Sequence, residues 1–326
     1  MTICPSFERC GGCFYQHLPF EDYLKNKYNF VKTAFLNQGI DCEIQPIVSI
    51  PFGTRRRATF AFQKGKIGFN ALKSHQIIAL NACPALVQPL SDFLPRLQTL
   101  IRELKGSGEI AVLNTPFGID MHIKRSGVGN LTLNQRELLA DFALKNNVAR
   151  LLYNKEPIVQ QIQLPFPPDS FLQPSAEGEE VLVNLVLTHL GDSKKVADLF
   201  CGSGTFTKPI AQKGLSVQGY DIAGDSLKAL GNMGFERDLF RNPLLPNELN
   251  AFDAVVIDPP RAGGKEQCRQ LAQSQVQRIL MISCNPNTAS RDIKDLMNGG
   301  YKLEKIIPVD QFVYTNHIEI FCVLTK

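Results

Sequence analysis

Hydrophobic residues after position 165 alternate between two spacings. Short apolar runs, bounded by polar residues or prolines and typical of buried strands, are separated by stretches with helical spacing. The predicted strands are Val196–Phe200, Leu215–Tyr220, Phe252–Ile257, Arg278–Ile282, Lys302–Val309 and Ile318–Leu324. The predicted helices are Glu177–Leu190, Thr205–Gln212, Ala223–Leu230, Lys265–Ala272 and Thr288–Met297. This alternation predicts an α/β fold with a mostly parallel, doubly wound, Rossmann-like sheet that ends in an antiparallel pair.

The pattern before the proline-rich segment 164–168 is different, with short strand candidates broken by Gly, Asn and Pro. They are Ala58–Gln63 in a hairpin with 65–68, Gln76–Leu80, Glu109–Asn114, Gly118–Ile123, Arg150–Tyr153 and Pro157–Leu164. Helices are expected over Phe20–Asn37, Val87–Leu104 and Gln135–Lys145. We therefore predict a β-rich α+β domain over 1–165 and the Rossmann-like domain over 166–326. The helix at 20–37 could pack on the second domain.

Composition agrees with two soluble domains, because 326 residues exceed what one core usually organises. The net charge of +4, from 35 basic and 31 acidic residues, allows a nucleic-acid partner without requiring one. Arg55-Arg56-Arg57 is a candidate phosphate-binding run, although a solvated loop has the same composition. No run of about 18 apolar residues and no signal-peptide pattern is found. We expect a cytoplasmic protein with reduced cysteines, no membrane association and no obligate protein partner.

A glycine-containing turn follows the predicted strand Val196–Phe200. Gly202 and Gly204 would let a ligand pass close to the backbone. Asp221, at the end of the next strand, is placed to bind both hydroxyls of a ribose. Asp238, further along, could meet an adenine amino group. The glycines alone would indicate only a tight turn.

The charge of this turn distinguishes between ligands. Position 207 is Thr, so the third glycine of a dinucleotide site is missing. Asp198, before the glycines, would repel a pyrophosphate but attract a cationic sulfonium group. The turn therefore favours S-adenosylmethionine over NAD.

Three short motifs lie at the ends of predicted strands. Asp258-Pro-Pro-Arg261 follows Phe252–Ile257, Ser283-Cys284-Asn285 follows Arg278–Ile282, and His317-Ile-Glu319 overlaps the start of Ile318–Leu324. Residues just past the strand ends line the ligand crevice of an open α/β sheet. Methylation of uracil C5 needs a thiolate that adds to C6 and a base that then removes the C5 proton. Cys284 is the candidate nucleophile and Glu319 the candidate base. The alternatives are a small core cysteine and a glutamate that faces water on an edge strand.

The motif at 258–261 argues against two related chemistries. Amino-group methyltransferases commonly have an aromatic residue after the two prolines, where this chain has Arg261. Cytosine-C5 enzymes place a cysteine after a proline in this loop, where this chain has Pro260. Uracil C5 remains. The other cysteines near the domain, Cys201, Cys268, Cys322 and Cys42, are interpreted as structural.

Together these residues resemble the RNA 5-methyluridine (uracil-C5) methyltransferase family over nearly the whole chain. The resemblance includes Phe171-Leu-Gln173, 198–204, 258–261, 283–285 and 317–319. It implies a class I methyltransferase domain in which Cys284 is the nucleophile and Glu319 the proton acceptor. The implied cofactor contacts are Gln173, Phe200, Gly202, Asp221 and Asp258, with Asp238 as a weaker one. This chain departs from the family at Asp221 (usually Glu), Ser175 and Thr205 (both commonly Asn), and no segment of this sequence is predicted to form the additional N-terminal RNA-binding barrel of some members.

Cys4, Cys10 and Cys13 form a C-x5-C-x2-C pattern, with Cys83 as a distant fourth thiol before Pro84. Four thiolates with one remote ligand suit a [4Fe–4S] cluster, and a Cys₄ zinc site is the competing interpretation. The five-residue gap is wider than usual zinc spacings. The resemblance to the iron–sulfur branch of the family, whose members act on 23S rRNA, favours the cluster over zinc and over unligated thiols.

The predicted function is therefore methylation of uracil C5 in RNA with S-adenosylmethionine, through a covalent adduct between Cys284 and C6 that yields 5-methyluridine. Ribosomal RNA is favoured over tRNA because of the iron–sulfur resemblance. The target base must be unstacked for the thiol to reach C6. The alternatives are a tRNA enzyme, an enzyme that methylates an exocyclic amine, and a non-catalytic iron–sulfur RNA-binding protein with a vestigial Rossmann domain.

Overall fold

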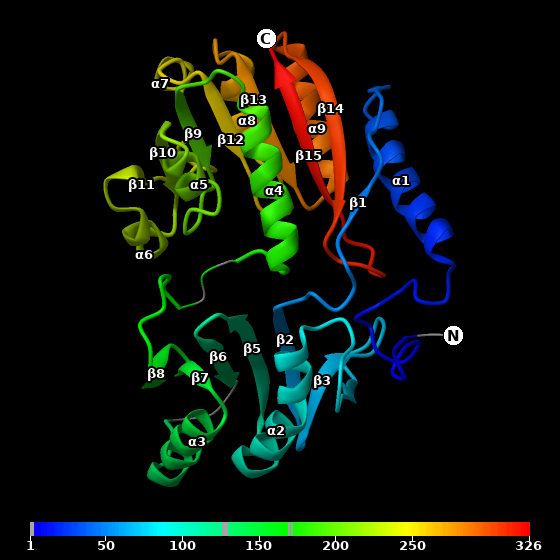
Figure 1. Ribbon diagram of the computed structural model, residues 1–326, viewed down its shortest axis with the longest axis vertical. Helices are drawn as coiled ribbons and strands as arrows, with labels where there is room; N and C mark the ends of the chain where they lie inside the picture. Colours follow the sequence, from blue (N-terminus) through cyan, green and yellow to red (C-terminus); the bar gives the residue numbers. More distant parts are fainter. Residues whose placement is uncertain (1–2, 126–129, 169, 171) are drawn as a thin grey trace.

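The computed structural model describes residues 3–125, 130–168, 170 and 172–326. Its strands form two sheets that lie in different halves of the molecule, and the N-terminal segment before α1 lies between them (Figure 1). Among the residues described, no helix is long and apolar enough to cross a membrane.

One half contains a seven-stranded sheet with helices on one side. Its spatial order is β4 (Ile77–Ala79), β3 (Lys66–Asn70), β2 (Arg57–Gln63), β5 (Ser107–Thr115), β6 (Gly118–Arg125), β7 (Val148–Tyr153) and β8 (Glu156–Gln160). The pairs are antiparallel except β6 with β7, which are parallel. A parallel pair needs a crossover, and α3 (Leu133–Lys145) supplies it. α3 and α2 (Gln88–Leu104) share one apolar core with this sheet.

The other half contains an eight-stranded sheet. Its spatial order is β1 (Val48–Ser49), β14 (Lys302–Asp310), β15 (Glu319–Thr325), β13 (Arg278–Ser283), β12 (Ala254–Ile257), β9 (Lys195–Leu199), β10 (Ser216–Asp221) and β11 (Gly234–Glu236). Every pair is parallel except those that β15 makes with β13 and β14. The strand order and the antiparallel end confirm the predicted doubly wound sheet.

Helices cover both faces of this sheet. Those around it are α1 (Phe20–Leu36), α4 (Ala176–His189), α5 (Thr207–Gln212), α8 (Lys265–Ala272) and α9 (Pro286–Asn298). Side chains alternate along each strand, so Val255 and Ile257 of β12 share a core with α1, α8 and α9. Ala254 and Val256 share the opposite core with α4 and α5. The continuous apolar runs read from the sequence reflect this double burial.

The N-terminal part of the chain contributes to this second half. α1 packs against α9, and β1 extends the eight-stranded sheet by pairing with β14. Packing of the helix predicted at 20–37 on the Rossmann-like unit is therefore observed.

Several predicted elements differ from the structure. The helix expected over Ala223–Leu230 is only α6 (Gly224–Leu227), followed by the 3-10 segment η1 (Lys228–Met233) in which Gly231 has a φ of +56°. β8 ends at Gln160, four residues before the predicted Leu164. The short elements β1, β11 and α7 (Pro246–Leu249) were not predicted.

Candidate active site

The predicted site residues lie at one edge of the eight-stranded sheet. β9, β10, β12 and β13 are parallel and end at this edge, and β15 begins there because it is antiparallel to β13. The chain moves outward from β9 through β10 and β11, and then returns to the other side of β9 with β12. Such a reversal of strand order opens a crevice between the loops that follow the two strands. The glycine turn follows β9, and the Asp258 motif follows β12.

Cys284 and Glu319 face each other across β13 and β15. Ser283 of β13 pairs with Ile320 of β15, so Cys284 and Glu319 are one step further along the same register. Cys284 is half-buried, whereas the Glu319 side chain is only 6% exposed. β15 lies between β13 and β14, which rules out a glutamate facing water on an edge strand.

The pKa values of three side chains in the site, Glu319, Asp258 and Cys284, depend on burial and on the neighbouring charges. Burial raises the pKa of Glu319 to about 7, while the side chain of Gln311 and the charge of Lys27 act to lower it. Burial and the charge of Glu319 raise the pKa of Asp258 to about 8. Burial, Glu319 and Asp258 raise the pKa of the Cys284 thiol to about 11, opposed by nearby Arg261. Near neutral pH, this site can therefore hold protons on carboxyl groups that would be ionised in water.

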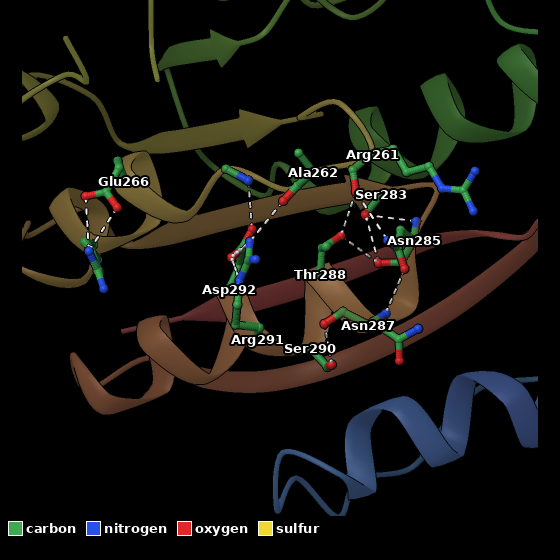
Figure 2. A network of polar contacts seen from close by, with 12 residues as sticks. Arg261, Ala262, Glu266, Ser283, Asn285, Asn287, Thr288, Ser290, Arg291 and Asp292 are labelled. Atoms are coloured by element: carbon green, nitrogen blue, oxygen red, sulfur yellow. Dashed lines mark hydrogen bonds and ion pairs between the residues drawn. The ribbon is translucent and has the colours of Figure 1, made fainter. Parts of the chain in front are cut away.

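A network of hydrogen bonds fixes the Asp258 motif and the residues after it to the first two turns of α9 (Figure 2). The carbonyl oxygen of Arg261 accepts from Asn285 Nδ2 at 3.3 Å and from Thr288 Oγ1 at 3.2 Å. Asp292 accepts from the Gly264 N–H at 2.7 Å. The Arg261 guanidinium points away from this network (Figure 2). The segment carrying Asp258 and the turn carrying Cys284 are thereby held together.

The glycine turn after β9 has three alternate positions with positive φ. Phe200, Gly202 and Gly204 have φ values of +62°, +53° and +90°. A Cβ added to Gly202 would meet nothing within 4 Å, so this residue borders open space. Asp221 accepts from the N–H groups of Gly202 at 3.0 Å and Ala223 at 2.8 Å. Its carboxylate has further lone pairs for a ligand.

Asp198 lies beneath this turn and is completely buried. Its Oδ2 accepts from Thr207 Oγ1 at 2.6 Å, whereas its Oδ1 is buried without a hydrogen-bond partner in the described part of the chain. Burial is the main cause that raises the pKa of Asp198 to about 7, with contributions from Asp258 and Asp221. A buried acceptor without a partner is costly, so a cationic ligand or a donor would be favoured here.

In the turn after β11, the Asp238 side chain hydrogen-bonds the backbone of the same turn. Asp238 Oδ1 accepts from the N–H groups of Phe240 at 3.0 Å and Arg241 at 3.2 Å. The Phe240 ring, which is 46% exposed, lies 5.3 Å from the ring centroid of Phe200. Asp238 thus stabilises a turn that carries an exposed aromatic ring towards the glycine turn. Its contact with adenine stays a prediction.

Gln173 is connected to Glu319 by a residue that the sequence did not indicate. The Gln311 amide donates to Gln173 Oε1 at 2.9 Å, and the Gln311 side chain also acts to lower the pKa of Glu319. Gln311 directly follows β14, so the end of a strand was the available signal. Phe171, in the motif with Gln173, lies outside the described residues.

The arginine run has a different role from the one expected. The Arg56 guanidinium donates to the Gln173 carbonyl at 3.0 Å and to Glu179 Oε2 at 2.7 Å. Arg57 donates to the Leu172 carbonyl at 3.4 Å, and Arg55 lies over the Phe312 ring, 5.6 Å from its centroid. These side chains join the two halves of the molecule, so the prediction of a phosphate-binding run is not supported.

The four N-terminal thiols line one small cavity. Cys4, Cys10, Cys13 and Cys83 surround it together with apolar residues and Arg55. Burial raises the pKa of Cys83 to about 11, with the other three thiols contributing. Within the described ranges, no group of three or more His, Cys, Asp or Glu side chains is arranged to hold a metal ion. The predicted structural cysteines Cys201, Cys268 and Cys322 are buried, and Cys42 is half-buried.

Comparison with known proteins agrees with this geometry. An uncharacterized RNA methyltransferase of Brucella suis is 40% identical over 99% of this chain and 84% of its own length. One of Agrobacterium fabrum is 35% identical over 97% of this chain and 82% of its own. The 23S rRNA (uracil(1939)-C(5))-methyltransferase of Aliivibrio salmonicida is 29% identical over 97% of this chain and 80% of its own.

A family described as tRNA (uracil-5-)-methyltransferase matches residues 232–326. The tRNA (uracil-54, C5)-methyltransferase of Pyrococcus abyssi, solved with S-adenosyl-L-homocysteine, shares the fold with a TM-score of 0.75. It is 23% identical and covers 99% of this chain and 88% of its own. The predicted class I methyltransferase fold with a β-rich N-terminal part is therefore confirmed. The chain belongs to the S-adenosylmethionine-dependent RNA uracil-C5 methyltransferase family.

Proposed function

We propose that the chain converts a uridine of ribosomal RNA to 5-methyluridine through a covalent adduct between Cys284 and C6 of the base. The observation that carries this proposal is the register that sets Cys284 opposite Glu319 at the edge where the glycine turn and Asp258 also lie. A nucleophile, a base and a cofactor turn on one crevice are what methylation of C5 needs.

The surroundings of the glycine turn fit S-adenosylmethionine. Gly202 leaves open space, Asp221 can accept from ribose hydroxyls, and the unpartnered Asp198 oxygen and Asp258 favour a cation nearby. Gln173, Phe200 and Asp238 complete the proposed contacts. When bound, the cofactor supplies the electrophilic methyl group.

The residues of the chain account for the remaining steps. The Cys284 sulfur forms a bond to C6, which makes C5 electron-rich enough to take the methyl group. Glu319 then accepts the C5 proton, the C5–C6 double bond reforms, and the sulfur leaves as the thiolate. A carboxyl group with a pKa of about 7 is well matched to this exchange near neutral pH. Arg261 and the N-terminus of α9 both favour the thiolate form of Cys284.

Ribosomal RNA is the proposed substrate class, and tRNA is the competing one. The similarity to the Aliivibrio 23S rRNA enzyme over nearly the whole chain supports the former, whereas the family match at 232–326 and the Pyrococcus structure carry tRNA names. The test is incubation of the protein with S-adenosylmethionine and either unmodified rRNA or unmodified tRNA, followed by nucleoside mass spectrometry. We expect 5-methyluridine in rRNA. 5-Methyluridine in tRNA alone would overturn the substrate assignment, and its absence from both would overturn the reaction.

The cysteine cavity is proposed to hold a [4Fe–4S] cluster through Cys4, Cys10, Cys13 and Cys83. Four thiols around one cavity suit this inorganic group, and a Cys₄ zinc site is the competing assignment. The five-residue gap between Cys4 and Cys10 is wider than usual zinc spacings and favours the cluster. The cluster would join the N-terminal segment to β4 and its neighbours without a redox step in the reaction. Iron and acid-labile sulfide in equal amounts after anaerobic purification are expected, and stoichiometric zinc would contradict the assignment.

A further inference from the structure

Lys27 is a buried cation on α1, with a side chain only 4% exposed. Its ammonium donates to Asp310 Oδ1 at 2.5 Å, to the His317 carbonyl at 2.5 Å and to the Phe312 carbonyl at 3.4 Å. These contacts use the three donors of an ammonium group. All of the acceptors belong to the segment 310–317, which ends β14 and leads to the start of β15.

The surroundings of this cation form a built polar site. Asp310 is completely buried and also accepts a hydrogen bond from the Tyr23 hydroxyl. The Tyr23 oxygen in turn accepts from the Tyr314 N–H at 2.8 Å. Lys27 lies on the buried stripe of α1 between Tyr23 and Val31, where an apolar side chain would pack without any desolvation cost. A charged network at this position calls for a role other than packing.

The segment held by Lys27 leads directly to the proposed base, since His317 is two residues before Glu319. It also carries Gln311, next to Asp310, which donates a hydrogen bond to Gln173 and acts to lower the pKa of Glu319. The positive charge of Lys27 also lowers the pKa of Glu319 against the effect of burial. Lys27 therefore acts on the Glu319 carboxylate in two ways, by holding the segment before it in place and by its positive charge.

We propose that Lys27 is a positioning residue for Glu319, which holds the segment 310–317 against α1 through its contacts with Asp310, Phe312 and His317. This inference rests on the proposed function. It predicts that Lys27 acts on the release of the methylated base and not on the addition of Cys284.

Several other charged or titratable groups lie on the elements packed around Glu319. They are Asp258 after β12, Cys284 after β13, Asp310 at the end of β14, His317 before β15, and Arg261 and Arg55, which face His317. Asp258 and Cys284 lie on the substrate side, whereas Lys27 approaches from α1. Replacement of Lys27 therefore removes a cation without changing a group that contacts the base.

The test is a single-turnover reaction of wild-type protein and Lys27→Met with substrate RNA, in which adduct formation and decay are followed on denaturing gels from pH 6 to 9. We expect adduct formation at an unchanged rate. The pH midpoint of adduct decay should rise by about one unit, because Glu319 without its cation is a weaker acid. Lys32→Met, at an exposed position of the same helix, should match the wild type. Lys27→Arg, which retains the charge, should restore the midpoint.

Two further variants separate an effect through Glu319 from general damage. In a Glu319→Gln background, Lys27→Met should not slow adduct decay further, since the group on which it acts is absent. Lys27→Met combined with Asp310→Asn removes both buried charges and avoids an unpaired carboxylate; it carries the pH test if Lys27→Met does not fold. Decay with an unchanged midpoint, or additive slowing with Glu319→Gln, would overturn the role of Lys27. Absence of adduct in the wild type would instead overturn the proposed function.

Discussion

Cys284 and Glu319 lie opposite each other because β15 runs antiparallel to β13, with Ser283 paired to Ile320. Two residues 35 positions apart (319 − 284) in the chain are thereby brought to one register position at the sheet edge. The last strand of the sheet must reverse direction for this to happen. In an all-parallel sheet, the start of that strand would lie at the opposite edge from the end of β13.

Glu319→Gln should trap the covalent adduct. The amide cannot accept the C5 proton, so Cys284 can add to the base but cannot be eliminated. We expect adduct decay to be slowed at least about 100-fold, as measured by denaturing gels after mixing with substrate RNA and cofactor. Glu304→Gln, on the exposed surface of β14, is the matched control and should turn over normally. Normal turnover by Glu319→Gln would remove Glu319 from the reaction.

Gly202→Ala should weaken S-adenosylmethionine binding by about tenfold or more, an affinity change of about 1.4 kcal/mol. Gly214→Ala is a matched control, because both glycines have positive φ and an added Cβ meets nothing within 4 Å at either position. Both variants should lose similar stability through backbone strain. Isothermal titration should show weaker binding only for Gly202→Ala, whose methyl group would enter the proposed cofactor space. Equal affinities for the two variants would place the cofactor elsewhere.

The stability of the cofactor-free protein should fall as the pH rises from 6 to 8. The pKa values of Asp258, Glu319 and Asp198 are raised to about 8, 7 and 7 in the folded chain, mainly by burial. Between their unfolded values near 4 and these values, the folded state binds more protons than the unfolded state. The free energy of unfolding contributed by these groups is therefore present below about pH 4 and is lost as the pH rises through 7 to 8.

The measurement for this prediction is the melting temperature at pH 6 and at pH 8. Asp258→Asn should show a smaller decrease between the two pH values than the wild type, since one of the titrating groups is gone. Asp192→Asn, at an exposed position, should retain the full decrease. A larger decrease in Asp258→Asn than in the wild type would contradict the assignment of raised pKa values.

Most of the Rossmann-like half could be predicted from the sequence because its strands are buried on both faces and appear as continuous apolar runs. β11 was missed because Gly234-Phe-Glu is only three residues long, and β1 has two. The helix predicted over Ala223–Leu230 is instead a short α-helix followed by a 3-10 segment, within which Gly231 has a positive φ.

The placement of the candidate site residues at one sheet edge could be predicted because parallel strands present their carboxyl ends together. Lys27 and Gln311 could not, since their roles depend on packing between α1 and the segment after β14. A signal for Lys27 existed: it falls on the four-residue spacing of the buried residues Tyr23, Val31 and Phe35. From hydrophobicity alone, the apolar face of this helix is predicted along Leu24, Tyr28, Val31 and Phe35, which passes over the lysine.

The central claim is that the Cys284 sulfur bonds covalently to C6 of a uracil in RNA. Its most direct test uses substrate RNA in which uridine is replaced by 5-fluorouridine, with S-adenosylmethionine present. Fluorine at C5 leaves no proton for Glu319 to accept, so the adduct cannot resolve. We predict a slowly migrating protein–RNA band on denaturing gels for the wild type and for Cys42→Ala, and none for Cys284→Ala with cofactor binding retained. A band of undiminished strength with Cys284→Ala, or no band with the wild-type protein, would contradict the account.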